Sequence, residues 1–299
     1  MAETRNHLSP AEGIWSLRRL PDMDEAQFNQ WQTLLEHRTG ITLSSGRKSF
    51  LETNLGIRMR EIGCSSYQAY YEKIVSGPDA VVEWSTLVDR LTVQETRFFR
   101  DPDAFRLVSD YVLTRPRETL KRRPLEAWSV GCSTGEEPYT LAMLLNECME
   151  GLSLQPLFGV TGSDISLPAI EKARQGQFNA RKLLGMDEDM KARYFRPSER
   201  NTVEIVNSIR DRVCFTRLNV LDLDKAPMHG MNIIFCQNLL IYFRRWRRRE
   251  IVKRLAERLA PGGLLVLGQG ELTDWQPPGL QRLPSEHVLA WIKRQSDEE

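Results

Sequence analysis

The sequence predicts an α/β protein, in which a mainly parallel sheet carries helices on both faces and follows a small all-helical domain. Up to about residue 90 the apolar spacing is helical and no strand pattern is visible. After Pro124, short apolar runs of strand length alternate with helical patterns, which is typical of parallel strands joined by helices. The chain has 299 residues, enough for each part to form its own core.

The N-terminal side is expected to hold a tail and four helices. Residues 1–20 are polar and mixed, and predict an extended tail. Residues 21–90 predict the helical domain, in which Asp22 or Asp24 caps the first helix and Gly40 ends it. The further helices are expected over 45–62, 67–75 and 81–91. Residues 91–124 predict a linker with one helix from 101 to about 113, followed by a basic connector.

Residues 125–299 are expected to form the α/β domain. Its strands are predicted over 125–130, 157–163, 213–219, 231–236, 264–268 and 287–293. Helices are predicted from the first strand's turn to 149, over 167–175 and over 246–259. Residues 178–212 interrupt the alternation with a polar helical segment, 181–194, and a short β run, 202–206. We interpret them as an inserted subdomain that contains β structure.

Composition narrows the classes of function. Lys and Arg number 41 against 40 Asp and Glu, so no global basic field favours nucleic acid or an anionic membrane. The first residues lack a signal-peptide pattern, and no apolar run approaches the ~20 residues that a bilayer requires. The five cysteines are scattered without a C-x-x-C pair, which favours reduced cysteines and no metal site. We therefore expect a cytoplasmic protein, not inserted in a membrane, and a monomer.

The most informative segment is 128–139, which reads WSVGCSTGEEPY. It predicts a strand, a glycine-bounded turn and a helix that opens on Glu136 and Glu137, and such a turn places backbone N–H groups against a ligand. The turn lacks the lysine of a phosphate-binding loop and does not spell G-x-G-x-x-G. Its carboxylates favour a ligand with cationic groups, such as an adenosyl compound with a sulfonium and an ammonium. One carboxylate is expected to cap the helix, and the other to meet the ligand or an adjacent polar group; the residues alone leave open which is which.

Other polar residues follow the later strands. Asp164 ends the second strand, where an acidic residue accepts both ribose hydroxyls of a nucleoside, unless it only caps the next helix. Asn219 stands where an adenine contact would fall, although such residues often only form turns. Gln237 and Asn238 interrupt an apolar run at the end of the fourth strand. Together with the late P-G-G turn at 261–263, these residues favour an S-adenosylmethionine-dependent methyltransferase over a dehydrogenase.

Several motifs in order resemble the chemoreceptor glutamate O-methyltransferases of bacterial chemotaxis, the CheR family. The resemblance covers about 22–293 and is carried by the segments 96–100, 128–139, 163–165, 173–174, 235–238, 241–243 and 261–263 with Gly268. It implies a Rossmann-like methyltransferase domain, a small helical N-terminal domain and a β-rich insert. It also implies S-adenosyl-L-methionine as cofactor, S-adenosyl-L-homocysteine as product, and the cytoplasmic domain of a methyl-accepting chemoreceptor as partner.

The resemblance further implies a set of site residues. The residues expected around the cofactor are Gln94, Thr96, Arg100, Glu137, Asp164, Asn219, Val220, Gln237 and Asn238. Arg100 and Tyr242 are also expected to line the methyl-transfer site. The sequence departs from the family at Gln94, where Asn is common, at Gln237, where Arg is common, and at 268–271, which reads GQGE instead of GHSE. These departures indicate a divergent branch, for which the chemosensory system of type IV pili (PilK-like) is one candidate.

The implied reaction needs no general base. A free glutamate has a pKa near ~4.3 and is ionised at pH 7, so the absence of a Ser/His/Asp arrangement is no objection. Arg100 could orient the acceptor carboxylate and Tyr242 could donate a hydrogen bond or exclude water. Two alternatives stay open from the residues alone: a methyltransferase for a small molecule or RNA, and a non-catalytic scaffold that docks on receptors.

Two groups of basic residues suggest a partner surface. The run 244–249, RRWRRR, directly follows Tyr242, and cations at the start of a helix oppose its dipole. Such a run is usually a solvated helix start; we hypothesise that this one attracts an acidic receptor surface. Arg47 and Arg58 fall near one face of the second helix, which the family links to receptor contact, although a solvated face is an equal interpretation.

Overall fold

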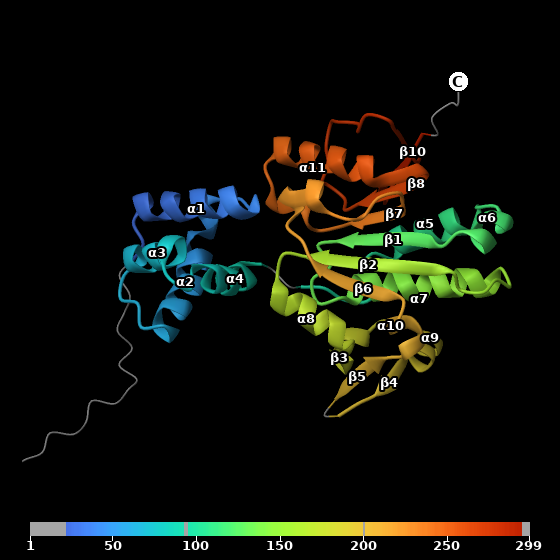
Figure 1. Cartoon of the computed structure of the whole chain (residues 1–299), viewed down its shortest axis with the longest axis horizontal. Helices are drawn as coiled ribbons and strands as arrows, with labels where there is room; N and C mark the ends of the chain where they lie inside the picture. The colour runs from blue at the N-terminus through green and yellow to red at the C-terminus, as the bar shows by residue number, and fades with distance from the viewer. Residues whose placement is uncertain (1–21, 93–94, 200, 295–299) are drawn as a thin grey trace, which may run out of the picture.

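A computed structural model describes residues 22–92, 95–199 and 201–294 as a helical part beside a larger α/β part (Figure 1). Gln94 and the predicted tail at 1–20 lie outside the described residues. The division of the chain into a tail, a helical domain, a linker and an α/β domain stays a prediction, whereas the individual elements can be compared one by one.

The helical part contains the four expected helices. They are α1 (Glu25–Thr39), α2 (Lys48–Glu61), which follows the turn η1 (Ser45–Arg47), α3 (Tyr67–Ser76) and α4 (Ala80–Leu91). Helix α1 begins at a capping box in which Asp24 and Gln27 bond each other's backbone N–H groups, and it ends at Gly40 with φ 76°. Trp31 and Tyr70 are buried at the centre of this domain's own core, with ring centroids 5.5 Å apart.

The α/β part is built on a seven-stranded sheet with the order β6-β2-β1-β7-β8-β10-β9. The strands are β1 (Leu125–Val130), β2 (Phe158–Asp164), β6 (Val213–Arg217), β7 (Met231–Cys236), β8 (Leu259–Leu267), β9 (Leu280–Arg282) and β10 (Leu289–Lys293). The first five in the sheet are parallel, and β10 pairs antiparallel with both β8 and β9. The prediction of a mainly parallel sheet is confirmed. Strand β9 was not predicted, because Leu280 is its one apolar residue.

One predicted boundary is wrong. The P-G-G segment at 261–263 was expected to turn into the strand, but β8 begins at Leu259 and includes it. The pairing with β7 shifts between Met231 and Ile233, which face Leu259 and Leu264. The four residues between these partners therefore bulge out of the ladder, and Gly262 takes a positive φ of 71° there.

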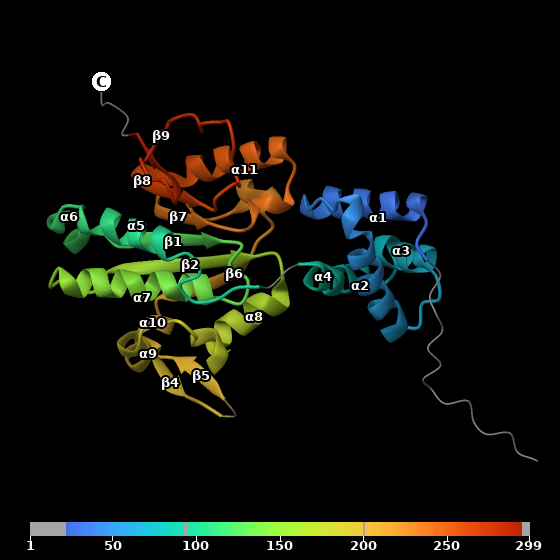
Figure 2. The same cartoon turned by 180° about the vertical axis from the view of Figure 1, so that it is seen from behind.

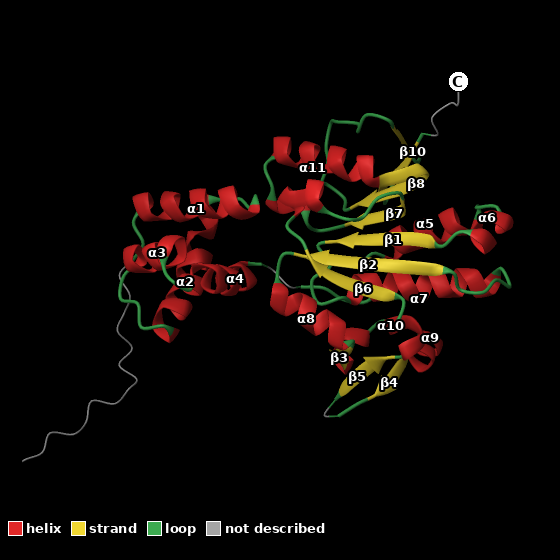
Figure 3. Cartoon of the chain, viewed as in Figure 1, coloured by secondary structure: helices red, strands yellow, loops and turns green. Residues whose placement is uncertain are grey.

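Helices cover both faces of the sheet (Figures 2 and 3). They are α5 (Pro102–Leu113), α6 (Arg117–Arg122), α7 (Glu136–Gly151), α8 (Leu167–Gln175) and α11 (Arg245–Arg258). One core contains side chains of α5, α7 and α8, and the core on the other face contains those of α11. Helices over 102–113 and 167–175 are confirmed with caps at Asp101 and Ser166, whereas the basic connector contains the unpredicted short helix α6.

The interruption of the alternation is a separate small sheet, β3-β5-β4, with antiparallel pairing. It consists of β3 (Gln177–Asn179), β4 (Phe195–Pro197) and β5 (Thr202–Ile205), with α9 (Glu188–Tyr194) and α10 (Asn207–Arg210). The predicted β run is present, but the helix is shorter than expected, because 180–183 form a 3₁₀ turn and Gly185 has φ 82°. The ring of Phe98 packs edge-on against Phe178 and Phe195 and ties this insert to the segment before α5.

Candidate active site

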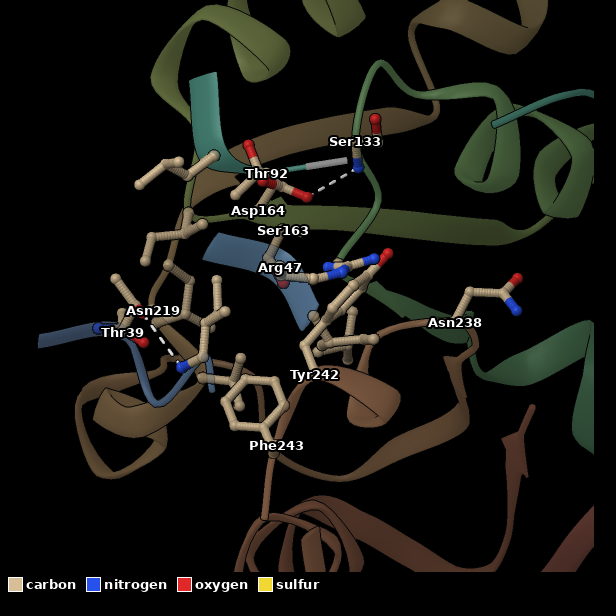
Figure 4. A pocket seen from close by; sticks show the side chains of 18 residues that line it. Thr39, Arg47, Thr92, Ser133, Ser163, Asp164, Asn219, Asn238, Tyr242 and Phe243 are labelled. Atoms are coloured by element: carbon tan, nitrogen blue, oxygen red, sulfur yellow. Dashed lines mark hydrogen bonds between the residues drawn. The ribbon is translucent and has the colours of Figure 1, made fainter. Parts of the chain in front are cut away.

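A cavity opens where the carboxyl ends of β1, β2 and β7 meet, and the helical domain supplies one of its walls (Figure 4). Thr39, Ile41, Arg47, Leu91 and Thr92 come from the helical side. The α/β side contributes Val130, Gly131, Ser133, Ser163, Asp164, Ile165, Leu218, Asn219, Val220, Asn238, Leu239, Tyr242 and Phe243. Parallel sheets bind ligands at this edge.

The turn after β1 forms the floor of the cavity. Gly131 and Gly135 have φ of 77° and 97°, and a Cβ on Gly135 would lie 2.8 Å from the Cβ of Ala173. The N–H of Ser133 donates to Asp164 Oδ2 at 2.9 Å, drawn in Figure 4. Within the part of the chain that the structure describes, the buried Oγ of Ser133 has no hydrogen-bond partner. An unsatisfied hydroxyl beside a cavity is suited to a polar ligand.

Asp164 is held at the end of β2 by backbone groups. Its two oxygens accept from the N–H of Ser133 and the N–H of Ser166, each at 2.9 Å. Burial raises the pKa of this carboxyl, and the backbone hydrogen bonds oppose that shift. The prediction that the acidic residue at the second strand's tip faces the ligand crevice agrees with its place in the cavity wall.

A second, more polar cavity adjoins the first and shares Gly131, Ser133, Asn238 and Tyr242 with it. Its other lining residues are Glu95, Thr96, Arg97, Arg100, Phe105, Cys132, Glu137, Gln237 and Ile241. The two cavities therefore bring together all the predicted site residues that the structure describes. Their individual roles stay predictions.

Glu137 is half-buried and lines the second cavity. Ser129 Oγ donates to its Oε1 at 2.7 Å. Burial raises the pKa of Glu137 to about 8, with the charges of Glu271 and Asp101 adding to the rise and the Ser129 hydrogen bond and Arg100 opposing it. A carboxyl with this pKa is mostly protonated at pH 7 and ionises readily beside a cation.

Glu136 has a different role from its neighbour. The expectation that one of the two carboxylates caps the helix is not met, because Glu136 forms a salt bridge with Lys182 at 3.0 Å and accepts from Thr134 Oγ1 at 2.7 Å. Lys182 Nζ also donates to the carbonyl of Thr96 at 2.6 Å. The buried carboxylate thus ties the insert and the 95–100 segment to the start of α7.

The polar residues after β6 and β7 also make contacts within the protein. Gln237 Nε2 donates to Asp101 Oδ2 at 2.9 Å, and Asn238 takes the left-handed conformation with φ 59°. Asn219 Nδ2 donates to the carbonyl of Arg38 at 2.9 Å. The predicted adenine contact of Asn219 is untested, but its amide clearly helps to join the two domains at the cavity.

Sequence reasoning missed one residue that lines the site and one that supports it from behind. Arg47 was assigned to a partner surface, but it lines the first cavity, with its guanidinium carbon 5.8 Å from the ring centre of Tyr242. Glu271 is 1% exposed, and its oxygens accept from the N–H groups of Leu240 at 2.8 Å and Gly268 at 2.7 Å. Glu271 therefore fixes the turn that carries Tyr242. The one available signal was an acidic residue soon after an apolar strand.

The fold and the two cavities define a class: a Rossmann-like methyltransferase that depends on S-adenosyl-L-methionine. A model of the CheR methyltransferase, SAM binding domain, matches residues 94–288, and a model of the CheR methyltransferase, all-alpha domain, matches residues 26–92. The chain belongs to the CheR methyltransferase family.

Two relatives named as chemotaxis protein methyltransferases agree with this assignment. The chain is 32% identical over 247 residues to chemotaxis protein methyltransferase 2 of Pseudomonas aeruginosa, with 82% of this chain and 85% of the relative covered. It is 30% identical over 253 residues to the chemotaxis protein methyltransferase of Escherichia coli, with 83% and 85% covered. Magnesium protoporphyrin IX methyltransferase from Synechocystis, solved with bound SAM, is 14% identical, with 79% of this chain and 96% of that chain covered and a TM-score of 0.36.

The predicted family, cofactor and enzyme class are confirmed: the protein is a protein-glutamate O-methyltransferase of chemotaxis that uses S-adenosyl-L-methionine. The alternatives of a small-molecule or RNA methyltransferase and of a non-catalytic scaffold are not favoured. None of the described helices is long and apolar enough to cross a membrane.

Proposed function

We propose that this enzyme, as a cytoplasmic monomer, methylates glutamate side chains in the cytoplasmic domain of a methyl-accepting chemoreceptor. The observation that carries the proposal is the pair of adjoining cavities. The first contains Asp164 and an apolar end, and the second contains Glu137, Arg100 and Tyr242. The names of the relatives support a chemotaxis substrate. The division into domains and the pilus branch stay predictions.

The residues of the first cavity fit an adenosyl group. Val130, Leu218, Val220 and Phe243 give it an apolar wall suited to a base, and the Asp164 carboxylate is suited to ribose hydroxyls. Glu137 lies toward the second cavity, where an ionised carboxylate would bind an ammonium. When bound, S-adenosyl-L-methionine supplies a methyl group on a positively charged sulfur.

Arg100 and Tyr242 are proposed to hold the acceptor. Arg100 Nη1 donates to the carbonyl of Glu95 at 2.6 Å, which leaves its other N–H groups available to orient one oxygen of an acceptor carboxylate. The second oxygen keeps its lone pairs for the new bond to the methyl carbon as the carbon–sulfur bond breaks. Tyr242 lines both cavities; its hydroxyl is proposed to donate a hydrogen bond to the acceptor, and its ring to exclude water from the line of transfer.

The test uses the whole enzyme with receptor-containing membranes and a tritiated methyl donor. Ester formation is measured as methanol released by base, and S-adenosyl-L-homocysteine binding is measured by calorimetry. We expect Arg100→Ala to lower kcat/KM by about 10- to 150-fold, the worth of a charge-assisted hydrogen bond. Tyr242→Phe is expected to lose about fivefold.

Two results would contradict the proposal. One is a wild-type enzyme that binds S-adenosyl-L-homocysteine but releases no base-labile methanol. The other is an Arg100→Ala enzyme with full activity. Arg106→Ala is the matched control, because this arginine is mostly exposed on α5 and its salt bridge among the described residues is a surface pair with Asp103.

A further inference from the structure

The basic residues in and after the run at the start of α11 have different surroundings in the structure. Arg244 and Arg248 make contacts within the protein. Arg244 pairs with Glu36 of the helical domain, and Arg248 donates to the carbonyls of Phe243 at 2.8 Å and Ile241 at 3.1 Å. Replacing Arg248 would therefore disturb the turn that carries Tyr242, so the whole run cannot be treated as one docking surface.

Three other basic side chains face outward. Arg245, Arg249 and Lys253 are spaced i, i+4, i+8 and form one stripe along α11, which we name the cationic stripe. At 1.5 Å per residue it is about 12 Å long. The side chain of Trp246, 55% exposed, lies in the same shallow groove. The ring of Trp275 supports Arg249 and Lys253 at 5.8 and 6.0 Å.

Acidic neighbours neutralise the cationic stripe only weakly. Arg245 lies 3.4 Å from Asp274, and both side chains are mostly exposed, so this pair contributes little. Glu250 lies in the groove but already pairs with Arg247 at 2.7 Å and with Arg254 at 3.0 Å. Three cations in a row therefore face solvent with an exposed tryptophan beside them.

Helix stability does not explain this arrangement. Like charges at i, i+4 repel each other, and cations in the first turns of a helix oppose its dipole. Cationic side chains next to an exposed aromatic ring suit a partner that brings carboxylates together with apolar surface.

We propose that the cationic stripe docks an acidic helical segment of the acceptor protein, beside the glutamate that is methylated. This inference rests on the proposed function. Arg245 follows Tyr242 by three residues, so their Cα atoms are at most about 11 Å apart. A helix that presents one glutamate to Tyr242 can thus place carboxylates one or two turns away on the stripe. The stripe selects glutamates with acidic neighbours at helical spacing.

The test compares two triple variants with the same loss of charge. The stripe variant carries Arg245→Gln, Arg249→Gln and Lys253→Gln. The control carries Lys121→Gln, Arg122→Gln and Arg123→Gln, three exposed cations at the end of α6. In Figure 1, α6 lies at the end of the α/β part that is far from the helical domain. Both are assayed with a soluble receptor cytoplasmic fragment, by methyl transfer and by equilibrium binding.

We expect the stripe variant to raise KM and the dissociation constant for the fragment about tenfold at low salt, with kcat and S-adenosyl-L-homocysteine affinity unchanged. The difference should shrink at high salt, and the control should stay within about twofold. Equal effects in the two variants, or no effect in the stripe variant, would overturn the proposal. Loss of binding to phosphatidylglycerol vesicles with unchanged fragment binding would also overturn it, in favour of a membrane surface.

Failure of the proposed function gives a different result. In that case the wild-type enzyme transfers no methyl group to the fragment although it binds S-adenosyl-L-homocysteine. Equilibrium binding of the fragment to the two variants still decides whether the stripe recognises an acidic helix.

Discussion

Two glutamates in different parts of the molecule, Glu83 and Glu137, have pKa values shifted in opposite directions. Glu83, in the helical domain, accepts from Arg58 Nε at 2.8 Å, from Arg58 Nη2 at 2.6 Å and from the hydroxyl of Tyr70 at 2.7 Å. The hydrogen bonds from Arg58 lower the pKa of Glu83. Glu137, in the active site, accepts from Ser129, and burial raises its pKa to about 8.

We interpret the opposite pKa shifts as the difference between a carboxylate that is paired within the fold and a carboxyl that is kept for a ligand. A structural carboxylate has its cation within the fold, so it is charged and satisfied from the moment the chain folds. At the candidate active site the carboxyls of Glu137 and Asp164, and that of Glu271 beside it, are held by hydroxyl or backbone N–H groups, and none forms a salt bridge among the described residues. On the proposed function, this arrangement leaves Glu137 to pair with a cationic ligand.

The largest expected effect comes from breaking the ion pair between Arg58 and Glu83. Arg58→Met removes the cation of Glu83 and leaves a nearly buried charge unpaired. We expect a loss of about 3 kcal/mol in the free energy of unfolding, measured by urea denaturation, with S-adenosyl-L-homocysteine affinity retained in the folded enzyme.

The matched control for Arg58→Met is Glu61→Gln, which removes an exposed partner of the same arginine and should cost about 0.5 kcal/mol. If the two substitutions destabilise the chain equally, the conclusion that the buried charge of Glu83 depends on Arg58 is wrong.

The next effect concerns Glu271. In Glu271→Gln, the amide cannot accept from both backbone N–H groups at once, so one of Leu240 and Gly268 is left without an acceptor. We expect a loss of about 1–3 kcal/mol in stability and a lower kcat, because the turn that carries Tyr242 loosens. Denaturation and single-turnover methyl transfer measure the two effects. A variant with normal kcat would show that Glu271 supports the fold alone.

The smallest expected effect concerns Glu137 and the pH dependence of ligand binding. Cationic ligands should bind ionised Glu137, so S-adenosyl-L-homocysteine affinity should rise about tenfold per pH unit below pH 8 and level off above it. Calorimetry in two buffers of different ionisation enthalpy should show nearly one proton released at pH 7. Glu137→Gln should bind more weakly at pH 8 and lose this pH dependence.

The stability of Glu137→Gln gives an independent check. Folding raises the pKa of Glu137 from 4.5 to about 8, so the folded chain keeps a proton that the unfolded chain has released. The free energy of unfolding therefore falls as pH rises between these values, and the glutamine variant should lack that part of the slope. A wild-type profile as flat as the variant's would contradict the raised pKa.

The sequence was sufficient for features that depend on local pattern and on parallel strands. Helix α8 occupies the predicted residues, and Asp164 and Glu137 lie at the expected sheet edge because the ends of parallel strands meet there. It was insufficient where a contact spans the chain. Asn219 bonds a carbonyl 181 residues away, and Arg47 reaches Tyr242 only through the docking of two domains. No periodicity encodes such pairs.

The junction between the domains has a consequence for how the two halves can be exchanged. Thr42 donates to the carbonyl of Tyr242 from both its N–H and its hydroxyl, and a Cβ on Gly40 would lie 2.6 Å from the ring of Phe243. A helical half transplanted from a relative should therefore restore a working enzyme only when position 40 stays glycine, because a side chain there would meet the Phe243 ring and would strain the positive φ of 76°. The two domains should therefore be exchangeable only when the residues at their junction fit each other. In a chimera without this fit, we expect the domains to fold separately and not to form the cavity that both of them line.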